Sequence, residues 1–336
     1  MSVLLAGDIG GTKTLLALYR AGTEQLEPLC SRRYNSEDWA DLAPMVEAFL
    51  EEARSTAAPD ELPAAACFAV AGPVQQGSAR LTNLPWQLEE RELRAATGIA
   101  AVELVNDFAV LVYGLHHLGP AQQASIRQGN ASSEEPVLIL GAGTGLGVAF
   151  GVPGPAGLMA VASEAAHAEF APRNEAEWQL KQWLAADLEI PRVSVERVVS
   201  GTGLGHVARW LLSERHPDSE HPLQQCNGNL PEAVANAAAL GDPLAREALD
   251  LWLEAYGSIT GDLALTGLCR GGIWLAGGTA GKLLMELRSH LFRRAFLDKG
   301  RLAAELEPLA ITAVIDPAIG EFSAACRARM LLGTAG

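Results

Sequence analysis

Hydrophobic and polar positions divide this chain into short apolar runs that are separated by glycine-rich or polar breaks. An apolar run at residues 3–6 leads into a glycine-rich segment at 7–12, and a second apolar run follows at 15–19. This order predicts a strand, a glycine-rich turn and a second strand. The same layout recurs roughly 130 residues further along, at 137–152, which predicts two structurally related halves.

The remaining apolar patterns alternate between the spacing of helices and that of strands. Helices are predicted over residues 42–54, 89–97, 175–188, 231–240, 243–264, 281–292 and 320–332, and strands over 64–70, 102–105, 273–276 and 311–315. Trp178 and Trp183, in the helix at 175–188, are expected in the core. The polar segment 213–229 is expected to form a long exposed loop. Strands that alternate with helices predict an α/β protein.

Length and composition favour a globular protein with two domains. The chain has 336 residues, of which 49% are hydrophobic and 19% are charged, so the burial of apolar groups can offset the loss of chain entropy. At roughly 100–200 residues per domain, this length predicts two domains. The net charge of −15 produces a field that repels phosphate backbones and anionic lipids. Binding to nucleic acid or to a membrane is therefore not expected.

The cysteines and the N-terminal segment indicate a cytoplasmic protein. Cys30, Cys67, Cys226, Cys269 and Cys326 lie far apart and form no C-x-x-C pair, which argues against a zinc knuckle and against a disulfide framework. The first residues lack the basic region and the long apolar run of a signal peptide. No segment approaches the roughly 18 consecutive apolar residues of a membrane helix.

Three glycine-rich turns, at 7–12, 141–147 and 277–281, are the strongest candidates for chemistry. Glycine lets backbone N–H groups converge on an anion such as phosphate, because no Cβ blocks the approach. The alternative is that these turns only close hairpins. A strand rather than a helix follows 141–147, which disfavours a Rossmann motif, and Leu283 stands where a P-loop needs serine or threonine.

Four segments, in this order, resemble a known family. They are Gly7-Asp8-Ile9-Gly10-Gly11-Thr12, Asn106-Asp107-Phe108, Gly141-Ala142-Gly143-Thr144-Gly145-Leu146-Gly147 and Leu275-Ala276-Gly277-Gly278. Together they are similar to the motifs of the bacterial glucokinases, which belong to the superfamily of sugar kinases, heat-shock ATPases and actin. The resemblance extends from about residue 7 to about residue 320.

The resemblance implies a fold and a set of ligands. It implies a two-domain α/β protein with the actin-like ATPase (ribonuclease H-like) fold. The small domain would contain residues 1–110 and 317–336, the large domain would contain residues 111–316, and a cleft would separate them. ATP, Mg²⁺ and glucose would bind in that cleft. A cytoplasmic homodimer with a role in glycolysis is also implied by the resemblance.

The resemblance further implies which residues hold ATP and Mg²⁺. Asp8 would bind the hydrated Mg²⁺. The other cofactor-binding residues would be Gly10, Gly11, Thr12, Lys13, Gly143, Thr144 and Gly145 at the phosphates, and Gly277 and Gly278 at the adenosine. From the residues alone, Asp8 could instead cap a turn and Lys13 could be a solvated turn residue.

Asn106 and Asp107 are the residues for which the resemblance implies sugar contact, with Asp107 as the general base. A primary hydroxyl is a weak nucleophile, so a carboxylate that accepts its proton during phosphoryl transfer suits the reaction. The alternative is an Asx turn between a strand and a helix. The other implied sugar-binding residues are Glu164, His167, Glu196 and Asn83. For these four, a polar surface or a simple turn is the alternative.

The chain departs from the family pattern around Glu164, where Ser163, Ala165 and Ala166 replace glycines. Residues with a Cβ disfavour positive φ angles, so we expect a differently arranged loop and a changed sugar affinity. No cysteine-rich zinc motif follows His167. This histidine is therefore interpreted as a sugar contact and not as a zinc ligand.

The leading hypothesis is a glucokinase that transfers the γ-phosphoryl group of ATP to the 6-hydroxyl of glucose, giving glucose 6-phosphate and ADP. A kinase for another hexose and a sugar-independent, actin-like ATPase are the alternatives. A sugar-responsive transcription regulator is disfavoured, because the first phosphate turn begins at Gly7 and no room is expected for a preceding helix-turn-helix.

Overall fold

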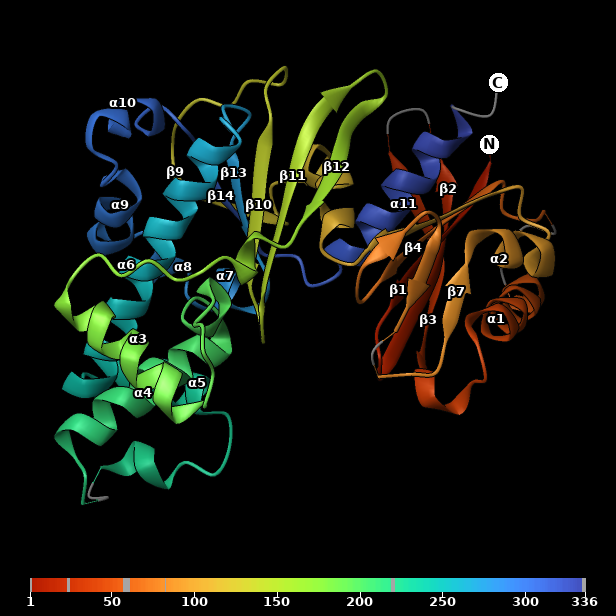
Figure 1. Ribbon diagram of the computed structural model, residues 1–336. Helices are drawn as coiled ribbons and strands as arrows, with labels where there is room; N and C mark the ends of the chain where they lie inside the picture. Colours follow the sequence, from red (N-terminus) through yellow and green to blue (C-terminus); the bar gives the residue numbers. More distant parts are fainter. Residues whose placement is uncertain (1, 23–24, 57–60, 82, 219–220, 334–336) are drawn as a thin grey trace. The chain divides into compact units, whose positions relative to one another are not determined.

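The computed structural model describes residues 2–22, 25–56, 61–81, 83–218 and 221–333, and the chain divides into two compact units. The first unit consists of residues 1–119, 151–162 and 316–336, and the second of residues 120–150 and 163–315. Figure 1 shows both, coloured along the sequence.

A five-stranded sheet with the order β3-β2-β1-β4-β8 forms the centre of the first unit, among its described residues. Strands β1, β4 and β8 are parallel, and β2 and β3 are antiparallel neighbours at one side. The elements are β1 (Val3–Ile9), β2 (Lys13–Ala21), β3 (Leu26–Asn35), α1 (Leu42–Thr56), β4 (Ala65–Val70), β5 (Val74–Gln75), β6 (Ser78–Arg80), β7 (Gln87–Glu89), α2 (Glu90–Thr97), β8 (Ala101–Asn106) and α11 (Ile319–Leu332).

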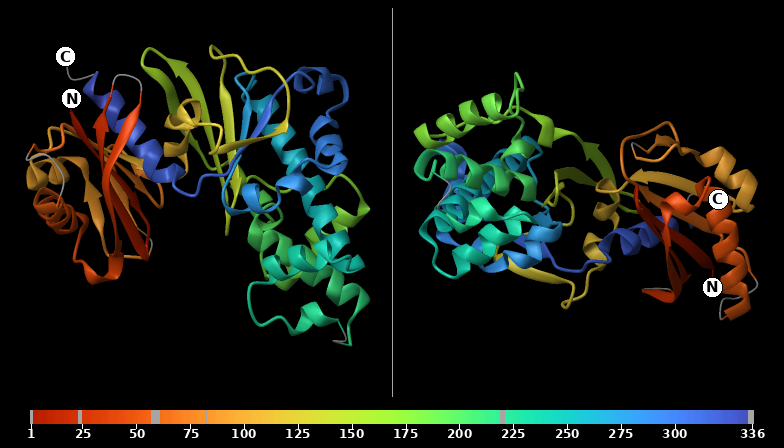
Figure 2. Two further views of the ribbon diagram at one scale, coloured as in Figure 1. Left: turned by 180° about the vertical axis from the view of Figure 1, so that it is seen from behind. Right: turned by 90° about the horizontal axis from the view of Figure 1, so that it is seen from below.

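Both faces of this sheet are covered by helices, because its central strands are mostly apolar. In β1, Val3 and Leu5 belong to a core that also contains Met45 and Phe49 of α1. Helix α11 packs on β1 and β4, and its buried residues are mostly small, such as Ala324 and Ala325. The view from behind in Figure 2 shows α11, in blue, lying along the sheet.

The other large sheet has six strands in the order β12-β11-β10-β13-β14-β9, again among the described residues. Strands β9, β10, β13 and β14 and the start of β11 belong to the second unit, whereas the end of β11 and most of β12 fall in residues 151–162, which are assigned to the first unit. The strands are β9 (Gln123–Arg127), β10 (Val137–Ala142), β11 (Leu146–Gly154), β12 (Gly157–Ser163), β13 (Ile273–Ala276) and β14 (Ile311–Val314). The helices are α3 (Glu175–Asp187), α4 (Gly201–Arg215), α5 (Leu230–Ala239), α6 (Pro243–Thr266), α7 (Gly278–Lys282), α8 (Leu284–Leu287), α9 (His290–Leu297) and α10 (Ala303–Leu306). Leucine, valine and alanine side chains from the helices and from β10, β13 and β14 form its core.

The internal repeat predicted from the two glycine-rich hairpins is confirmed. The strand order β12-β11-β10-β13-β14 reproduces the order β3-β2-β1-β4-β8. In each case the glycine turn joins the third strand of this order to the second, since residues 10–12 lie between β1 and β2, and residues 143–145 lie between β10 and β11. The equivalent turns therefore occupy equivalent places in the two sheets.

Three local predictions are wrong or incomplete. Trp178 is not a core residue, because it lies on the outer side of α3 and is 48% exposed, whereas Trp183 is half-buried against the core. The helix predicted at 281–292 is broken into α7, α8 and α9. The loop predicted at 213–229 begins only after α4 ends at Arg215 and contains a 3₁₀ turn at Pro222–Gln225; residues 219 and 220 lie outside the described residues.

Within the described part of the chain, no helix is both long and apolar enough to cross a bilayer.

Candidate active site

The turn between β1 and β2 is tight and is held from below by a buried serine. The N–H of Gly10 donates to the carbonyl of Lys13 over 3.0 Å. Ser36 is fully buried; its hydroxyl donates to the carbonyl of Gly10 over 2.9 Å, and its N–H donates to the carbonyl of Thr12 over 2.9 Å. These hydrogen bonds hold the carbonyl groups of the turn in place. The turn is therefore compact, a shape that suits the binding of a phosphate group.

A neighbouring segment touches the same turn. A Cβ added to Gly11 would lie 3.0 Å from the Cβ of Asn83, so a side chain at position 11 would displace Asn83. The glycine is therefore required by a close approach. This contact places Asn83, one of the predicted sugar-binding residues, beside the first phosphate turn.

Asp8, near the end of β1, lines a cavity of about 400 Å³ with Lys13, Arg33 and Glu321. Burial raises the pKa of the Asp8 carboxyl above its usual value, and the positive charge of Arg33 opposes that rise. A Cβ added to Gly320 would lie 3.2 Å from Oδ2 of Asp8, so α11 approaches the carboxylate closely. The predicted metal-binding carboxylate thus lies in a polar hollow of the first unit.

Asn106 ends β8 and positions Asp107 through a set of four hydrogen bonds. Its Nδ2 group donates to the carbonyl of Gly72 over 3.0 Å and to Oδ1 of Asp107 over 3.1 Å. Its Oδ1 accepts from the N–H groups of Phe108 and Ala109 over 3.1 and 3.0 Å. Because both amide hydrogens and both lone pairs are used, the geometry makes Asn106 a positioning residue for Asp107.

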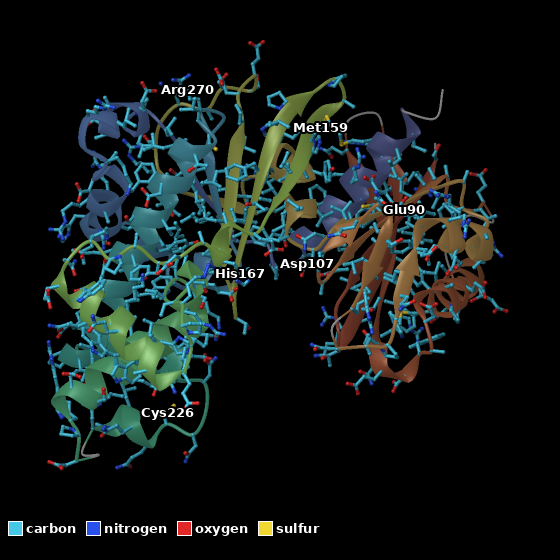
Figure 3. The ribbon with its side chains drawn as sticks, in the orientation of Figure 1. Glu90, Asp107, Met159, His167, Cys226 and Arg270 are labelled. Atoms are coloured by element: carbon cyan, nitrogen blue, oxygen red, sulfur yellow. The ribbon has the colours of Figure 1, made fainter. Side chains whose placement is uncertain are left out.

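The Asp107 carboxyl has the electrostatic character of a general base. Although the residue keeps an exposed face, burial of its carboxyl raises the pKa to about 6, and the charge of Asp8 contributes to that rise. Hydrogen bonds from the Phe108 backbone and the Asn106 side chain act in the opposite direction. A carboxyl with a pKa near 6 is ionised at neutral pH and is a better proton acceptor than an ordinary aspartate. Figure 3 labels Asp107.

In the second unit, two segments, the starts of α4 and α7, converge on the glycine turn between β10 and β11. The N–H of Gly201 donates to the carbonyl of Gly143 over 2.7 Å. The hydroxyl of Thr202 donates to the carbonyl of Thr144 over 2.8 Å, and the hydroxyl of Thr279 donates to the carbonyl of Ala142 over 2.7 Å. The predicted phosphate turn is therefore connected directly to the starts of α4 and α7.

These segments line a cavity of about 1010 Å³. Gly143, Thr144 and Gly278 contribute to its wall, and so do Gly201 and Thr202 at the N-terminus of α4. A helix N-terminus carries a positive dipole, which favours an anion such as a phosphate. At α4 the N–H groups of Gly201 and Gly203 are already donated to the Gly143 carbonyl and to the Ser200 hydroxyl. Gly277 has a φ of +83°, and a Cβ there would lie 3.0 Å from the carbonyl oxygen of Ala142, so this sharp entry into α7 requires glycine.

Glu196 is joined to the second glycine turn. Its Oε2 accepts a hydrogen bond from the N–H of Leu146 over 2.9 Å. A Cβ added to Gly145 would lie 2.4 Å from the same oxygen, so glycine is needed to let the carboxylate reach the backbone. The structure thereby brings Glu196 together with Gly145, two residues that were predicted to bind different ligands.

Glu164 and His167 flank a 3₁₀ turn at Ala165–His167 that packs against the turn at Val195–Arg197. The Oε2 atom of Glu164 and the Nε2 atom of His167 are 3.6 Å apart, and their side chains are 77% and 57% exposed. Both are available to a ligand. Figure 3 labels His167, in the segment that follows β12.

The alanines that replace family glycines in this segment fit an ordinary backbone. Among the described residues other than glycine, the positive φ angles occur at Gln76, Glu189 and Leu268, so neither Ala165 nor Ala166 needs one. Ala166 is buried and packs with the core of the second unit. The backbone at these two positions therefore has φ angles that residues with a Cβ adopt without strain.

The predicted residues thus form two groups, each within one unit. The first group is Asp8, Gly10, Gly11, Thr12, Lys13, Asn83, Asn106 and Asp107. The second group is Gly143, Thr144, Gly145, Glu164, His167, Glu196, Gly277 and Gly278. Comparison with known proteins identifies the class of enzyme that carries both. A family model described as glucokinase matches residues 5–331.

The chain belongs to the glucokinase family. A curated glucokinase from Nostoc punctiforme is 38% identical over 346 residues, which cover 98% of this chain and 100% of that protein. The crystal structure of a glucokinase from an Antarctic psychrotroph is 27% identical with a TM-score of 0.85, and the match covers 98% of this chain and 99% of that one. A glucokinase of the ROK family from Streptomyces griseus, solved with glucose and AMPPNP, shares the fold at 20% identity, with a TM-score of 0.62 and coverage of 97% and 99%.

Several residues that shape this glucokinase-family site were not predicted from the sequence. Ser36 supports the first turn, Thr202 and Thr279 bond to the second, and Arg33 and Glu321 line the hollow at Asp8. Thr279 lies inside the predicted glycine turn at 277–281, so a search for hydroxyl side chains in each turn would have found it, whereas Ser36 lies far along the sequence from the first turn. Arg33 and Glu321 carry no such signal, because tertiary packing alone brings β3 and α11 to Asp8.

Proposed function

We propose that this chain transfers the γ-phosphoryl group of ATP to the 6-hydroxyl of glucose, with Asp107 as the general base. Membership of the glucokinase family establishes the class of enzyme, an ATP-dependent hexose kinase. The observation that carries the assignment of the base is the Asp107 carboxyl, held by Asn106 and raised in pKa to about 6.

In the proposed mechanism, Asp107 accepts the proton of the 6-hydroxyl as the oxygen attacks phosphorus. At neutral pH the carboxyl is already ionised, so no preliminary deprotonation is needed. Asn106 donates to Oδ1 of Asp107, which fixes the direction of the carboxylate. Positioning and general-base catalysis are the contributions that a protein makes to phosphoryl transfer, since the bond changes take place between the substrates.

The nucleotide is proposed to occupy the cavity of the second unit. Its volume of about 1010 Å³ reaches the upper end of the range of roughly 300–1,000 Å³ that is usual for small-molecule sites. Gly143, Thr144 and Gly145 would hold phosphate oxygens through the backbone, and Gly277 and Gly278 would lie against the adenosine. The backbone N–H of Thr202, at the N-terminus of α4, would donate a further hydrogen bond to phosphate, since the hydroxyl hydrogen of this residue is already donated to the carbonyl of Thr144.

Asp8 is the residue proposed to hold Mg²⁺. The fit is favourable, because this carboxylate lies beside the turn of Gly10, Gly11 and Thr12, and Mg²⁺ usually binds to one or two carboxylates together with water and phosphate oxygens. When bound, Mg²⁺ would neutralise charge on the transferred phosphate. Lys13 would add a second positive charge there.

Glucose is proposed to bind at Asn106 and Asp107 and through Glu164, His167 and Glu196, with Asn83 as a further contact. Carboxylates and an imidazole offer the acceptors and donors that ring hydroxyls need, and a site that leaves a hydroxyl unpaired loses affinity.

We propose that sugar and ATP meet in a cleft between a small domain of residues 1–110 and 317–336 and a large domain of residues 111–316. Small-angle scattering with and without glucose tests this, because closure on the sugar requires a smaller radius of gyration.

A coupled assay over a panel of hexoses with ATP tests the proposed function. Glucose should give the highest kcat/KM, and ATP consumption without sugar should be negligible. Preference for mannose, fructose or an amino sugar would replace glucose as the substrate. ATP consumption that does not depend on any hexose would favour the sugar-independent, actin-like ATPase. A cytoplasmic location and a homodimer are also proposed from the family; sedimentation of the purified chain tests the dimer.

A further inference from the structure

The second unit has another cavity, outside the proposed nucleotide site, whose polar wall is dominated by arginine. Its volume is about 320 Å³. Arg127 of β9, Arg288 directly after α8 and Arg293 of α9 line it, above apolar side chains that include Leu287, Phe292 and Ile311. No acidic residue is part of its described lining. We call this cavity the arginine pocket. Figure 1 labels β9, α8 and α9, the elements that surround it.

Two of the three guanidinium groups are fixed in place by backbone carbonyls. Arg127 donates from Nη1 to the carbonyls of Leu306 and Leu309, over 3.0 and 2.7 Å, and from Nη2 to the carbonyl of Glu307. Arg288 donates from Nε and Nη2 to the carbonyl of Ser125, over 2.9 and 2.7 Å. Carbonyl groups orient these cations, but they do not neutralise them.

The third guanidinium group of the arginine pocket, that of Arg293, has no ion pair among the described residues. This is unexpected in a chain with a net charge of −15, where acidic partners are in excess. The adjacent Arg294 pairs with Glu254. Burial lowers the pKa of Arg127, and the charge of Arg293 lowers it further, while Glu307 acts in the opposite direction from outside the pocket. Like charges are therefore close together here, an arrangement that an anion would relieve.

We propose that the arginine pocket binds a small phosphate monoester. A guanidinium group has planar, paired N–H donors that match phosphate oxygens, and it keeps its charge at every physiological pH. Arg293 would supply such donors, whereas Arg127 and Arg288, which already donate to carbonyls, would contribute mainly positive charge. The apolar floor of Leu287, Phe292 and Ile311 suits the carbon skeleton of such a ligand. The volume is at the lower end of the usual range for small-molecule sites, roughly 300–1,000 Å³, which favours a ligand of a few carbon atoms.

Helix α8 connects this pocket to the proposed nucleotide site. Glu286 lines the larger cavity, whereas the next two residues, Leu287 and Arg288, line the arginine pocket. Helix α8 has only four residues, and its C-terminal end contributes to the walls of both cavities. A ligand that pulls Arg288 into the arginine pocket would therefore shift α8 and, with it, the wall of the larger cavity. Binding in the arginine pocket is thus proposed to change nucleotide affinity, and linkage requires the reverse effect to be equal.

Titration calorimetry on the full chain tests this proposal, with 3-phosphoglycerate as the probe. ADP and glucose are kept at saturating concentrations, so that the phosphate turns of the proposed active site are occupied. Wild type should bind the probe, and Arg293→Ala should weaken binding by about tenfold or more, because one charge-assisted contact is lost. Arg294→Ala is the matched control, since it removes the same charge from the same helix but outside the pocket. It should bind as wild type does.

Two further measurements define the ligand and the coupling. Glycerol 3-phosphate, which has no carboxylate, should also bind, whereas stronger binding of citrate than of either phosphate ester would overturn the assignment to phosphate. The Kd of ADP, measured with and without 3-phosphoglycerate, should differ in wild type and agree in Arg293→Ala; equal values in wild type would overturn the coupling. No binding of the probe up to about 10 mM, or equal affinity in wild type and Arg293→Ala, would overturn the site itself. None of these readouts depends on whether glucose is the preferred sugar.

Discussion

Asn106 donates a hydrogen bond of 3.1 Å from Nδ2 to Oδ1 of Asp107, and it uses its remaining hydrogen-bonding capacity on Gly72, Phe108 and Ala109. The sequence alone left two interpretations of this pair, an Asx turn and a catalytic site. The structure shows that they are compatible, because the Asx geometry of Asn106 is what orients the Asp107 carboxylate.

The pKa of Asp107 predicts the pH dependence of the reaction. Burial raises this pKa to about 6, and only the ionised carboxylate accepts a proton, so kcat/KM for glucose should fall as the pH decreases through about 6. The slope on the acidic side should approach tenfold per pH unit. Initial rates between pH 5 and 8, with Mg²⁺ and ATP saturating, provide the profile. A rate that stays constant down to pH 5 would show that another group is the base.

The same raised pKa predicts a pH-dependent effect on stability. Because the folded pKa lies above that of an unfolded aspartate, Asp107 contributes stability below about pH 4 that is lost as the pH rises through about 6. Replacement by asparagine removes this dependence. The Tm of Asp107→Asn relative to wild type should therefore be higher at pH 8 than at pH 5. An identical difference at both pH values would contradict a raised pKa.

Glu164 is expected to contribute to sugar binding. The change Glu164→Gln preserves size but turns an acceptor oxygen into a donor, so the KM for glucose should rise about tenfold. The KM for ATP should stay the same. Glu214→Gln, at an exposed position on α4, is the control for the loss of one negative charge. An unchanged KM for glucose in Glu164→Gln would remove this residue from the site.

Gly277 is expected to be essential for nucleotide binding. It has a φ of +83°, and a Cβ added there would lie 3.0 Å from the Ala142 carbonyl oxygen, so Gly277→Ala must shift the start of α7, which lines the proposed nucleotide cavity. The Kd of ADP, measured by calorimetry, should rise at least about tenfold. Gly281→Ala, in the same helix, is the control, since a Cβ there meets its nearest atom at 3.9 Å. Equal ADP affinity in the two variants would contradict this role.

The sequence predicted the structural elements that depend on local motifs, and it predicted less well the elements whose structure depends on tertiary packing. The glycine turns, the strand that ends at Asn106 and most helices followed from periodicity and turn residues. Helix α4 was not predicted, because it opens with Gly201, Gly203 and Gly205, which are poor helix formers. Buried Trp252 on α6 holds its start by donating to the Ser200 carbonyl over 2.9 Å, a contact between residues far apart in sequence.

The site showed the same division. Asp8, Asp107 and the turn glycines could be named from motifs, whereas the pairing of Gly145 with Glu196 and the approach of Gly320 to Asp8 depend on segments that meet only in the folded chain. Trp178 was misplaced because its helix has apolar residues on more than one side, and tertiary packing chose the side that carries Leu180 and Leu184.

The role of Asp107 as the general base is tested most directly by measuring the glucose affinity and the turnover of Asp107→Asn on the same preparation. Asparagine keeps the shape and most hydrogen bonds but cannot accept a proton at neutral pH. Glucose binding, followed by calorimetry, should stay within about tenfold of wild type, while kcat should fall by about 10²–10⁴-fold. A kcat close to that of wild type, with glucose still bound, would contradict the assignment of Asp107 as the general base.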